Sequence, residues 1–461
     1  MYLYHSMLSL DQIPRERAVA FVIGFGLVVL ILFAPSRESI ALVQSPEQNR
    51  LSSLSNSDPY ARLRDRCSSE AATFCAEKTS QTLLSCLHGH AMDAKEECRE
   101  EVKCHRPDKY HGHEECWDGI LRPISQEGIA SVRYDAVLPP GPGSHASNII
   151  YLHKYEALLL SWCYFATNQV VVTRRSVTAD RWSRPVTAAS EEYGSAQNSV
   201  LFYDEQRDVV TLLYTSQGGQ DSGVHMVTSS DGGATWGSNI NVAISKSSIM
   251  TKNHVIKSKS DQEWLLPVYT TFDSSAVWHS ATGEAGSWEP LCEVMAGTDA
   301  GRVQPTIVRK ADGNLLAFYR SRDVDWIYTA TSDDDGRTWT SPSRTPLPSN
   351  DSGIQAVMLK SGRTAIVFNN VAGSIRWPLS VALSEDYGAT WPWIADLEPV
   401  AGSTKGARGE YSYPSITQTP DEDLHISYTF NRESVRYARI TEAWIMEGSS
   451  GGAYRGLSKA T

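Results

Sequence analysis

Residues Ser332–Trp339 read SDDDGRTW, with the pattern Ser-x-Asp-x-Gly-x-Thr-Trp. The same pattern returns at Ser229–Trp236 and again at Ser384–Trp391. Two shorter relatives run from Ser176 to Trp182 and from Ser280 to Trp288. The serines that open the five copies are separated by 53, 51, 52 and 52 residues, so the chain repeats itself with a nearly constant period.

Each copy has the composition of a tight turn between two β-strands. Asp and Ser side chains accept hydrogen bonds from backbone amides a few residues ahead, and Gly supplies a positive φ angle. Thr favours the start of the next strand, and Trp packs as a large apolar anchor. A period near fifty residues with strand-like flanks indicates a radial or stacked array of small sheets.

The repeat resembles the Asp-box of the sialidase superfamily, whose fold is a six-bladed β-propeller. The resemblance implies an all-β propeller, which we place at residues 125–446. Between Ser131 and Trp444 lie 314 residues, and six blades of 52 residues need 312. Runs such as ALLLSWCYF, VVTLLYT and LHISYTF have strand character. We expect the last blade to close with a strand from the start of the domain, and the ligand site to lie in the central channel.

The amino-terminal segment predicts a membrane anchor. Residues 1–17 are polar and carry Arg15 and Arg17, and residues 18–34 are 17 consecutive uncharged residues. We expect residues 18–34 to be an uncleaved signal anchor, with a cleaved signal peptide as the alternative. The two arginines favour a cytoplasmic tail, hence a type II protein of the Golgi, the secretory lumen or the cell surface. Residues 35–58 read as a flexible stalk, and residues 447–461 as a disordered tail.

A cysteine cluster follows the stalk, and we expect residues 59–118 to form a small helical module with disulfides. Its six cysteines are Cys67, Cys75, Cys86, Cys98, Cys104 and Cys116. Residues 60–105 resemble the cysteine-rich repeat of a Golgi sialoglycoprotein family. Zinc is the alternative for one run in this module, which holds Cys104, His105, His111, His113 and Cys116. Cys163 and Cys292 fall in apolar strand-like runs and are expected to be buried thiols.

Composition limits the partners of the chain. The 461 residues carry a net charge of −11, which disfavours nucleic acid as a partner. Residues 18–34 make the membrane an expected partner through the anchor. We expect no cofactor and no catalytic metal.

The sialidase resemblance implies arginines that bind the carboxylate of an acidic sugar, because a guanidinium matches a carboxylate with two parallel hydrogen bonds. Arg376 precedes the Asp-box at Ser384, and Arg320 ends the strand-like run NLLAFYR, with Arg322 as its near alternative. The third arginine of the family has no counterpart here, because His145 stands at the matching place.

The resemblance also implies a tyrosine nucleophile in the segment Glu410–Ile416, which reads EYSYPSI. Tyr413 is the better match and Tyr411 the alternative. Gln304 stands where the family has the glutamate that activates the tyrosine, so Glu410 is the candidate substitute. No acid stands in residues 164–169, where the family has an aspartate.

These residues leave three functions open. The first is a sialidase-like exo-glycosidase that acts on sialic acid or a related acidic sugar of glycoconjugates. The second is a uronate polysaccharide lyase, for which His145 and Tyr413 would serve as base and acid beside Arg320 and Arg376. The third is a glycan-binding propeller that no longer catalyses, which the missing carboxylates suggest. All three predict an acidic glycan as the partner.

Overall fold

The computed structural model describes residues 119–449, apart from residues 125, 127, 139–142, 193, 219–221, 243–248, 271–272, 299–300, 324 and 399–409. The expected cytoplasmic tail, anchor, stalk and cysteine-rich module lie outside the described residues and stay predictions, as does the candidate zinc run. Within the described part, no helix has the length and apolar character needed to cross a membrane.

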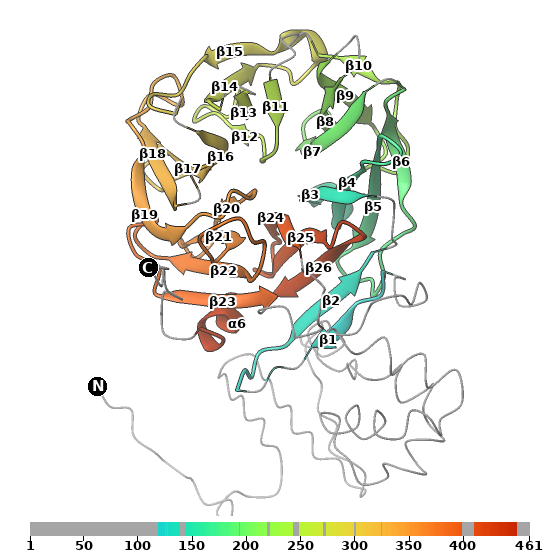
Figure 1. The fold of residues 1–461 in the computed structure, drawn as a ribbon. Coiled ribbons are helices and arrows are strands. Elements are labelled where there is room, and N and C mark those ends of the chain that lie inside the picture. Colours follow the sequence, from blue (N-terminus) through green and yellow to red (C-terminus); the bar gives the residue numbers. More distant parts are fainter. Residues whose placement is uncertain are drawn as a thin grey trace, which may run out of the picture. The chain divides into compact units, whose positions relative to one another are not determined.

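Six antiparallel sheets stand in a ring around a central axis, which confirms the predicted six-bladed propeller (Figure 1). In blades 1 to 3 the chain runs outward from the axis. The first blade comprises β3 (Ser144–Leu152), β4 (Ala157–Tyr164), β5 (Gln169–Ser176) and β6 (Val186–Ser190). The second comprises β7 (Ser195–Asp204), β8 (Val209–Gln217), β9 (Gly223–Ser229) and β10 (Ile240–Asn241). The third comprises β11 (Ile249–Thr251), β12 (Ile256–Lys257), β13 (Trp264–Thr270), β14 (Ser275–Ser280) and β15 (Glu289–Cys292).

Blades 4 to 6 follow the same plan. The fourth comprises β16 (Arg302–Arg309), β17 (Leu315–Ser321), β18 (Trp326–Ser332) and β19 (Ser343–Pro348). The fifth comprises β20 (Gln355–Met358), β21 (Thr364–Asn369), β22 (Leu379–Ser384) and β23 (Trp393–Glu398). The sixth comprises β24 (Tyr411–Gln418), β25 (Leu424–Phe430), β26 (Ser434–Ile440), β2 (Arg133–Val137) and β1 (Arg122–Ile124). The described helices are η3 (His153–Tyr155), η4 (Ala285–Ser287) and α6 (Glu442–Glu447).

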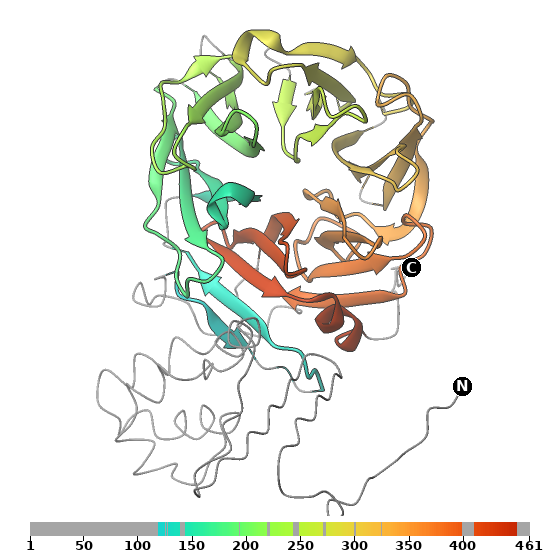
Figure 2. The ribbon, with the colours of Figure 1, turned by 180° about the vertical axis from the view of Figure 1, so that it is seen from behind.

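The ring closes as expected, with strands from the start of the domain completing the last blade. β2 pairs antiparallel with β26, and β1 adds outside it from Arg122, slightly before the expected boundary at residue 125 (Figure 2). Arg122, the first residue of β1, therefore lies on the outermost strand of blade 6 rather than near the axis.

The Asp-box forms the predicted turn between the third and fourth strands of a blade. In the copy at Ser332, the Asp334 carboxylate accepts hydrogen bonds from the Thr338 amide at 2.8 Å and the Thr338 hydroxyl at 2.6 Å. The Ser332 hydroxyl donates to Asp334 and accepts from the Gly336 amide, each at 2.8 Å. Gly336 has a φ of 95°, which favours glycine, and Trp339 is buried. The copies at Ser229 and Ser384 make the same bonds.

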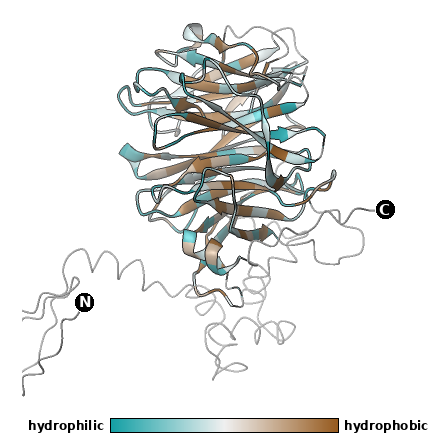
Figure 3. Cartoon of the chain, turned by 90° about the vertical axis from the view of Figure 1, so that its left-hand side faces the viewer, coloured by the Kyte–Doolittle hydropathy of each residue, from teal (hydrophilic) through white to brown (hydrophobic). Residues whose placement is uncertain are grey.

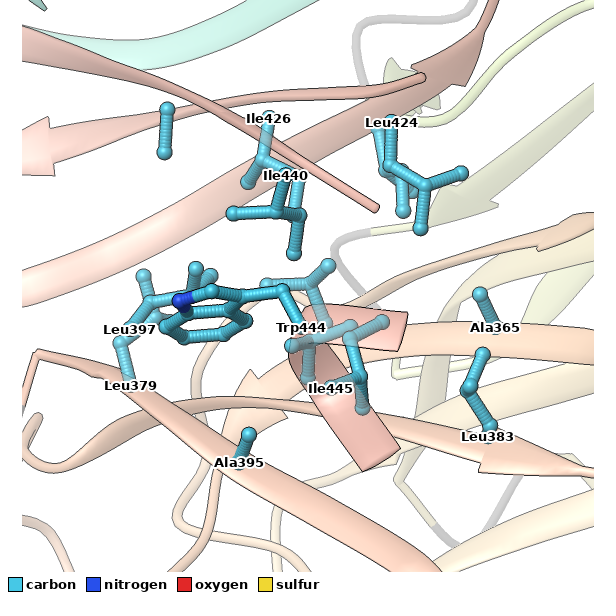
Figure 4. Close-up of a cluster of buried hydrophobic side chains, with 14 of the residues drawn as sticks. Ala365, Leu379, Leu383, Ala395, Leu397, Leu424, Ile426, Ile440, Trp444 and Ile445 are labelled. Carbon is cyan, nitrogen blue, oxygen red and sulfur yellow. The ribbon is translucent and has the colours of Figure 1, made fainter. Parts of the chain in front are cut away.

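The apolar core lies between neighbouring blades. Apolar residues concentrate along the strands, and the loops are mostly hydrophilic (Figure 3). Trp444 of α6 is 1% exposed and packs beside Leu379 and Leu397 in the cluster that joins blades 5 and 6 (Figure 4). Cys163 is a buried free thiol as expected, whereas Cys292 is a free thiol that is only partly buried.

Four of the innermost strands carry a bulge near their first residues. The pairing register shifts in β3, β7, β16 and β24. The residues that begin the bulges share a positive φ, with values of 57° for Ala146, 50° for Asn198, 53° for Gln304 and 51° for Tyr413. A bulge bends the strand and redirects a side chain. Four blades therefore share one local distortion at the same end of the inner strand. The candidate site lies at this end.

Candidate active site at the hub of the propeller

Tyr413 is the centre of the candidate site. It begins the bulge of β24 and is 9% exposed. Its phenol oxygen accepts a hydrogen bond of 2.8 Å from Nη1 of Arg320 and lies 3.5 Å from Nε2 of Gln304. Tyr411, the alternative from sequence, stacks on Phe430 with ring centroids 5.5 Å apart. The structure therefore brings Tyr413, and not Tyr411, to the predicted arginine.

Arg320 comes from β17, the second strand of blade 4, and its side chain is 6% exposed. Besides Tyr413, its Nη1 reaches Oε1 of Gln304 at 3.0 Å. Its Nε and Nη2 both lie 2.7 Å from Oδ1 of Asp351. Arg320 thus connects three parts of the ring. Gln304 belongs to blade 4, Asp351 to the loop before blade 5, and Tyr413 to blade 6.

Arg376 approaches the ring of Tyr413 from blade 5. The centre of its guanidinium group lies 5.4 Å from the ring centroid, and Arg320 lies at 5.8 Å. Nη1 of Arg376 donates to Oε1 of Glu410 at 2.7 Å. Oε2 of Glu410 accepts from Nε of Arg432 at 2.9 Å. Both carboxyl oxygens of Glu410 therefore hold arginines, of which Arg376 lies beside Tyr413.

The ionisation of Glu410 fits this holding role. Burial favours its protonated form, but the hydrogen bond from Arg432 and the charge of Arg376 outweigh burial and lower its pKa below the usual value. A carboxylate with a lowered pKa is a weak base. Glu410 is therefore suited to positioning Arg376 and Arg432 rather than to taking a proton from Tyr413.

We call the group of side chains around Tyr413 the hub. His145 belongs to the hub and stands at the place where the family has an arginine. It is 3% exposed, and its ring centroid is 4.3 Å from that of Tyr413. Its Nδ1 is 3.0 Å from the Thr429 hydroxyl, and Phe165 packs against its edge at 5.2 Å. Burial and the charges of nearby arginines hold the pKa of His145 well below its usual value, so the imidazole is neutral at neutral pH.

Lys252 is a hub residue that sequence reasoning missed. It follows β11 in blade 3 and is 2% exposed. Its Nζ donates to the carbonyl oxygen of Pro414 at 3.2 Å and lies 5.7 Å from the ring centroid of Tyr413. A Cβ atom on Gly353 would come within 3.1 Å of Lys252 and 3.2 Å of Tyr413, so glycine leaves room for this contact. Burial, followed by the charge of Arg320, lowers the pKa of Lys252 to about 7.

These cations change the acidity of the Tyr413 phenol. Burial alone would raise its pKa, but the charge of Arg320, the hydrogen bond from Gln304 and the charge of Arg376 together lower it below the usual value. The neighbouring Tyr269 behaves in the opposite way, because burial and its proximity to Tyr413 raise its pKa to about 12. Two phenols of the hub thus differ in acidity, and Tyr413 is the one that ionises more readily.

Arg322 lies at the edge of this group, with its side chain 35% exposed. It pairs with Asp273 through Nε, and its Nη1 is 3.8 Å from Oδ1 of Asp351. Arg322 therefore reaches the site through Asp351 and does not touch Tyr413 in the structure.

Asp351 and Asp273 are the acidic side chains that sequence reasoning did not assign. Both stand in connections between strands and have positive φ angles, 57° for Asp351 and 60° for Asp273. Neither lies in a family motif, so only the three-dimensional arrangement identifies them. Within the described residues, no group of His, Cys, Asp and Glu side chains could hold a metal ion.

Comparison with known families supports the fold. Residues 167–426 match the model of the BNR repeat-like domain, which spans more than half of the chain. No curated protein sequence matches the chain.

Solved structures share the fold at low sequence identity. The intramolecular trans-sialidase from Ruminococcus gnavus is 12% identical, with a TM-score of 0.54 over 66% of this chain and 95% of that one. The NanB sialidase from Streptococcus pneumoniae is 13% identical, with a TM-score of 0.55 over 66% of this chain and 69% of that one. A protein of unknown function from Dyadobacter fermentans is 16% identical, with a TM-score of 0.55 over 68% of this chain and all of that one. At these sequence identities, the likeness shows a shared fold alone.

Proposed function

Because the chain belongs to the BNR repeat-like domain family, we propose that its hub binds an acidic sugar of a glycoconjugate and acts on it as a sialidase-like exo-glycosidase. The observation that carries this proposal is the contact of Tyr413 with Arg320 and Arg376, which lowers the pKa of the phenol. An ionised phenol is the form that attacks an anomeric carbon.

The charge of the hub favours an anionic ligand. Its connected side chains include five basic residues, namely Arg320, Arg322, Arg376, Arg432 and Lys252, and three carboxylates, namely Asp273, Asp351 and Glu410. This local excess of positive charge stands within a chain of net charge −11. Clustered cations in a low-dielectric hub attract and orient an acid. The Ruminococcus gnavus structure contains oseltamivir carboxylate, which agrees with an acidic ligand in this fold.

In the proposed reaction, Arg376 and Arg320 orient the carboxylate of the sugar, and the Tyr413 oxygen forms a bond to the anomeric carbon while the glycosidic C–O bond breaks. The leaving oxygen takes its proton from water, and a second water then releases the sugar from Tyr413. Gln304 cannot accept a proton, so the arginine charges replace the base that activates the tyrosine.

An aryl glycoside tests this reaction, because an aryl leaving group needs little protonation. The full chain should release 4-methylumbelliferone from its glycoside of N-acetylneuraminic acid. Arg376→Ala should raise KM, since it removes a charge-assisted hydrogen bond to the carboxylate. Absence of turnover in a folded preparation that binds the acid would reject the hydrolase.

Gln304 favours a second candidate, a glycan-binding propeller without turnover. Its amide contacts Tyr413 at 3.5 Å and Arg320 at 3.0 Å, in the place where the family has a glutamate. Binding of N-acetylneuraminic acid without hydrolysis, abolished in Arg376→Ala, would favour this candidate over the enzyme.

The neutral imidazole of His145, 4.3 Å from the ring of Tyr413, favours a third candidate, a uronate lyase. A neutral histidine can remove a proton next to a carboxylate that arginines hold. Absorbance of an unsaturated uronate during incubation with polygalacturonate or alginate would distinguish the lyase from the hydrolase.

We also propose that the domain faces the secretory lumen or the cell surface, anchored through residues 18–34. The run of 17 uncharged residues behind Arg15 and Arg17 supports this location. Protease treatment of sealed microsomes should leave the propeller intact, whereas its digestion without detergent would place it on the cytoplasmic side.

A further inference from the structure

Every nitrogen of the Arg320 guanidinium group already has a partner within the protein. Nε and Nη2 each lie 2.7 Å from Oδ1 of Asp351. Nη1 donates to Gln304 and to Tyr413. Arg320 is only 5% exposed. A ligand carboxylate therefore cannot form two parallel hydrogen bonds with Nε and Nη2 while Asp351 stays in place.

Asp351 differs from Glu410, the other carboxylate on a hub arginine. Glu410 uses both oxygens, since Oε1 accepts from Arg376 and Ser412 and Oε2 accepts from Arg432. Asp351 contacts arginines only through Oδ1, and its Oδ2 has no hydrogen bond to any of the described residues. Its side chain is 32% exposed. Glu410 is thus held through both carboxyl oxygens, whereas Asp351 is held by Arg320 and Arg322 through one oxygen and is the more exposed of the two.

The backbone at Asp351 explains how the carboxylate reaches Arg320. Asp351 lies in the connection between β19 and β20 and has a φ of 57°. Asp and Asn adopt this left-handed conformation more readily than other residues with a side chain. The carboxylate therefore comes from a turn rather than from a paired strand, and its removal breaks no ladder of the sheet.

We propose that Asp351 occupies the position that the ligand carboxylate takes on Arg320, so that an acidic ligand binds by displacing the Asp351 carboxylate. This inference rests on the proposed function, because it requires an acidic ligand at this arginine. A sugar without a carboxylate cannot make the exchange, since it would leave Arg320 buried without an opposite charge. Asp351 would thus lower the affinity for an acid by the cost of its own displacement, and only an acid would reach Arg320.

The test compares three variants of the full chain by calorimetric titration with N-acetylneuraminic acid and with its methyl ester. Asp351→Asn removes the charge and keeps a residue that tolerates the backbone conformation, and Asp351→Gly removes the whole side chain. Asp273→Asn is the matched control, because it removes the same charge from the same edge of the hub but from Arg322 rather than Arg320. Thermal unfolding of each variant verifies that it is folded.

Both Asp351 variants should bind the free acid about tenfold more tightly than the unaltered chain, the expected gain when a charged hydrogen bond no longer has to be broken. The methyl ester should show no gain, and Asp273→Asn should change affinity far less. Equal or weaker binding by folded Asp351 variants would show that this carboxylate supports Arg320 instead of competing for it. If no folded protein binds the acid, the proposed function fails together with this inference.

Discussion

At the scale of single residues, the hub is a set of cations arranged around one phenol. Arg320, Arg376 and Lys252 lie within 5.8 Å, 5.4 Å and 5.7 Å of the ring centroid of Tyr413. Two of these cations are neutralised by Asp351 and Glu410, whereas Lys252 donates to a backbone carbonyl. The chemistry assigned to the site therefore depends on the oxygen of Tyr413.

Removal of that oxygen should separate binding from chemistry. Tyr413→Phe keeps the ring between Lys252 and the arginines, so we expect its affinity for N-acetylneuraminic acid to stay within about threefold of the unaltered chain. Turnover of the aryl glycoside should fall by about a thousandfold or more, because the nucleophile is lost. Initial rates and calorimetric titration measure the two effects, and unchanged turnover would exclude Tyr413 as the nucleophile.

Replacement of Lys252 should stabilise the fold. Burial and the charge of Arg320 lower the pKa of Lys252 from 10.5 to about 7, so the folded chain binds fewer protons than the unfolded chain between these values. The unaltered chain therefore gains stability as the pH rises from 7 to 10.5, and it bears the full cost of burial below pH 7.

Lys252→Met removes this cost. The variant should be more stable by a few kcal/mol at pH 6, at about 1.4 kcal/mol per pKa unit, and the advantage should shrink towards pH 10. Urea unfolding at several pH values measures the difference. A variant that is less stable at pH 6 would mean that the ammonium group stabilises the bulge at Tyr413 and Pro414 more than its burial costs.

At the scale of elements, the Asp-box turn is the unit that the sequence identifies most directly. Its side chains close the turn locally, so a pattern of eight residues contains the cause of the structure. The partial copy at Ser280 keeps one of these bonds, from the Gly283 amide to the Ser280 hydroxyl at 2.7 Å, and buries Trp288. The serine-to-glycine bond is thus shared by the three complete copies and by the partial copy at Ser280.

Asp334→Ala should lower the free energy of unfolding by about 1–2 kcal/mol, because it removes acceptors for the Thr338 amide and hydroxyl. Asp333→Ala is the control from the same turn, since Asp333 is exposed. Urea unfolding of both variants measures the effect. Equal stability of the two variants would mean that the carboxylate of Asp334 does not hold the turn.

The bulges of the inner strands mark the limit of what sequence reasoning could give for the site. Arg320, Arg376 and Tyr413 lie in segments that resemble family motifs, so the sequence alone could place them at the hub. Lys252 and Asp351 could not, because neither carries such a motif and their places depend on the bends of neighbouring chain segments. An alignment of the inner strands that matches Thr251-Lys252 with Val303-Gln304 could have identified Lys252 from the sequence.

At the scale of the whole molecule, a buried charge network lies where β2 closes the ring against β26, and it includes residues of blade 5. Arg133 of β2 pairs with Asp135 at 2.6 Å and donates to the carbonyl oxygen of Leu397 in blade 5. Glu398 accepts from Tyr428 at 2.7 Å and pairs with Arg436. The period of the Asp-boxes predicted six blades, but the partners of this network lie up to 303 residues apart in the chain, from Arg133 to Arg436, and follow no local pattern.

Arg133→Met should destabilise the propeller by about 3–5 kcal/mol, because it leaves the Asp135 carboxylate buried without its partner. The double variant Arg133→Met, Asp135→Leu should recover a large part of this loss, since both buried charges are gone. Thermal and urea unfolding measure the stabilities. A single variant as stable as the unaltered chain would show that β2 closes the ring without this ion pair.

In the proposed reaction, Tyr413, held by Arg320 and Arg376 at the hub, forms a bond to an acidic sugar. A fluorinated glycosyl fluoride of N-acetylneuraminic acid tests it most directly, because the electronegative substituent slows the breakdown of a covalent adduct. Mass spectrometry of the treated full chain should show one added sugar on the peptide that contains Tyr413, and none in Tyr413→Phe. Saturable binding of the reagent without an adduct, or an adduct on another residue, would exclude Tyr413 as the nucleophile.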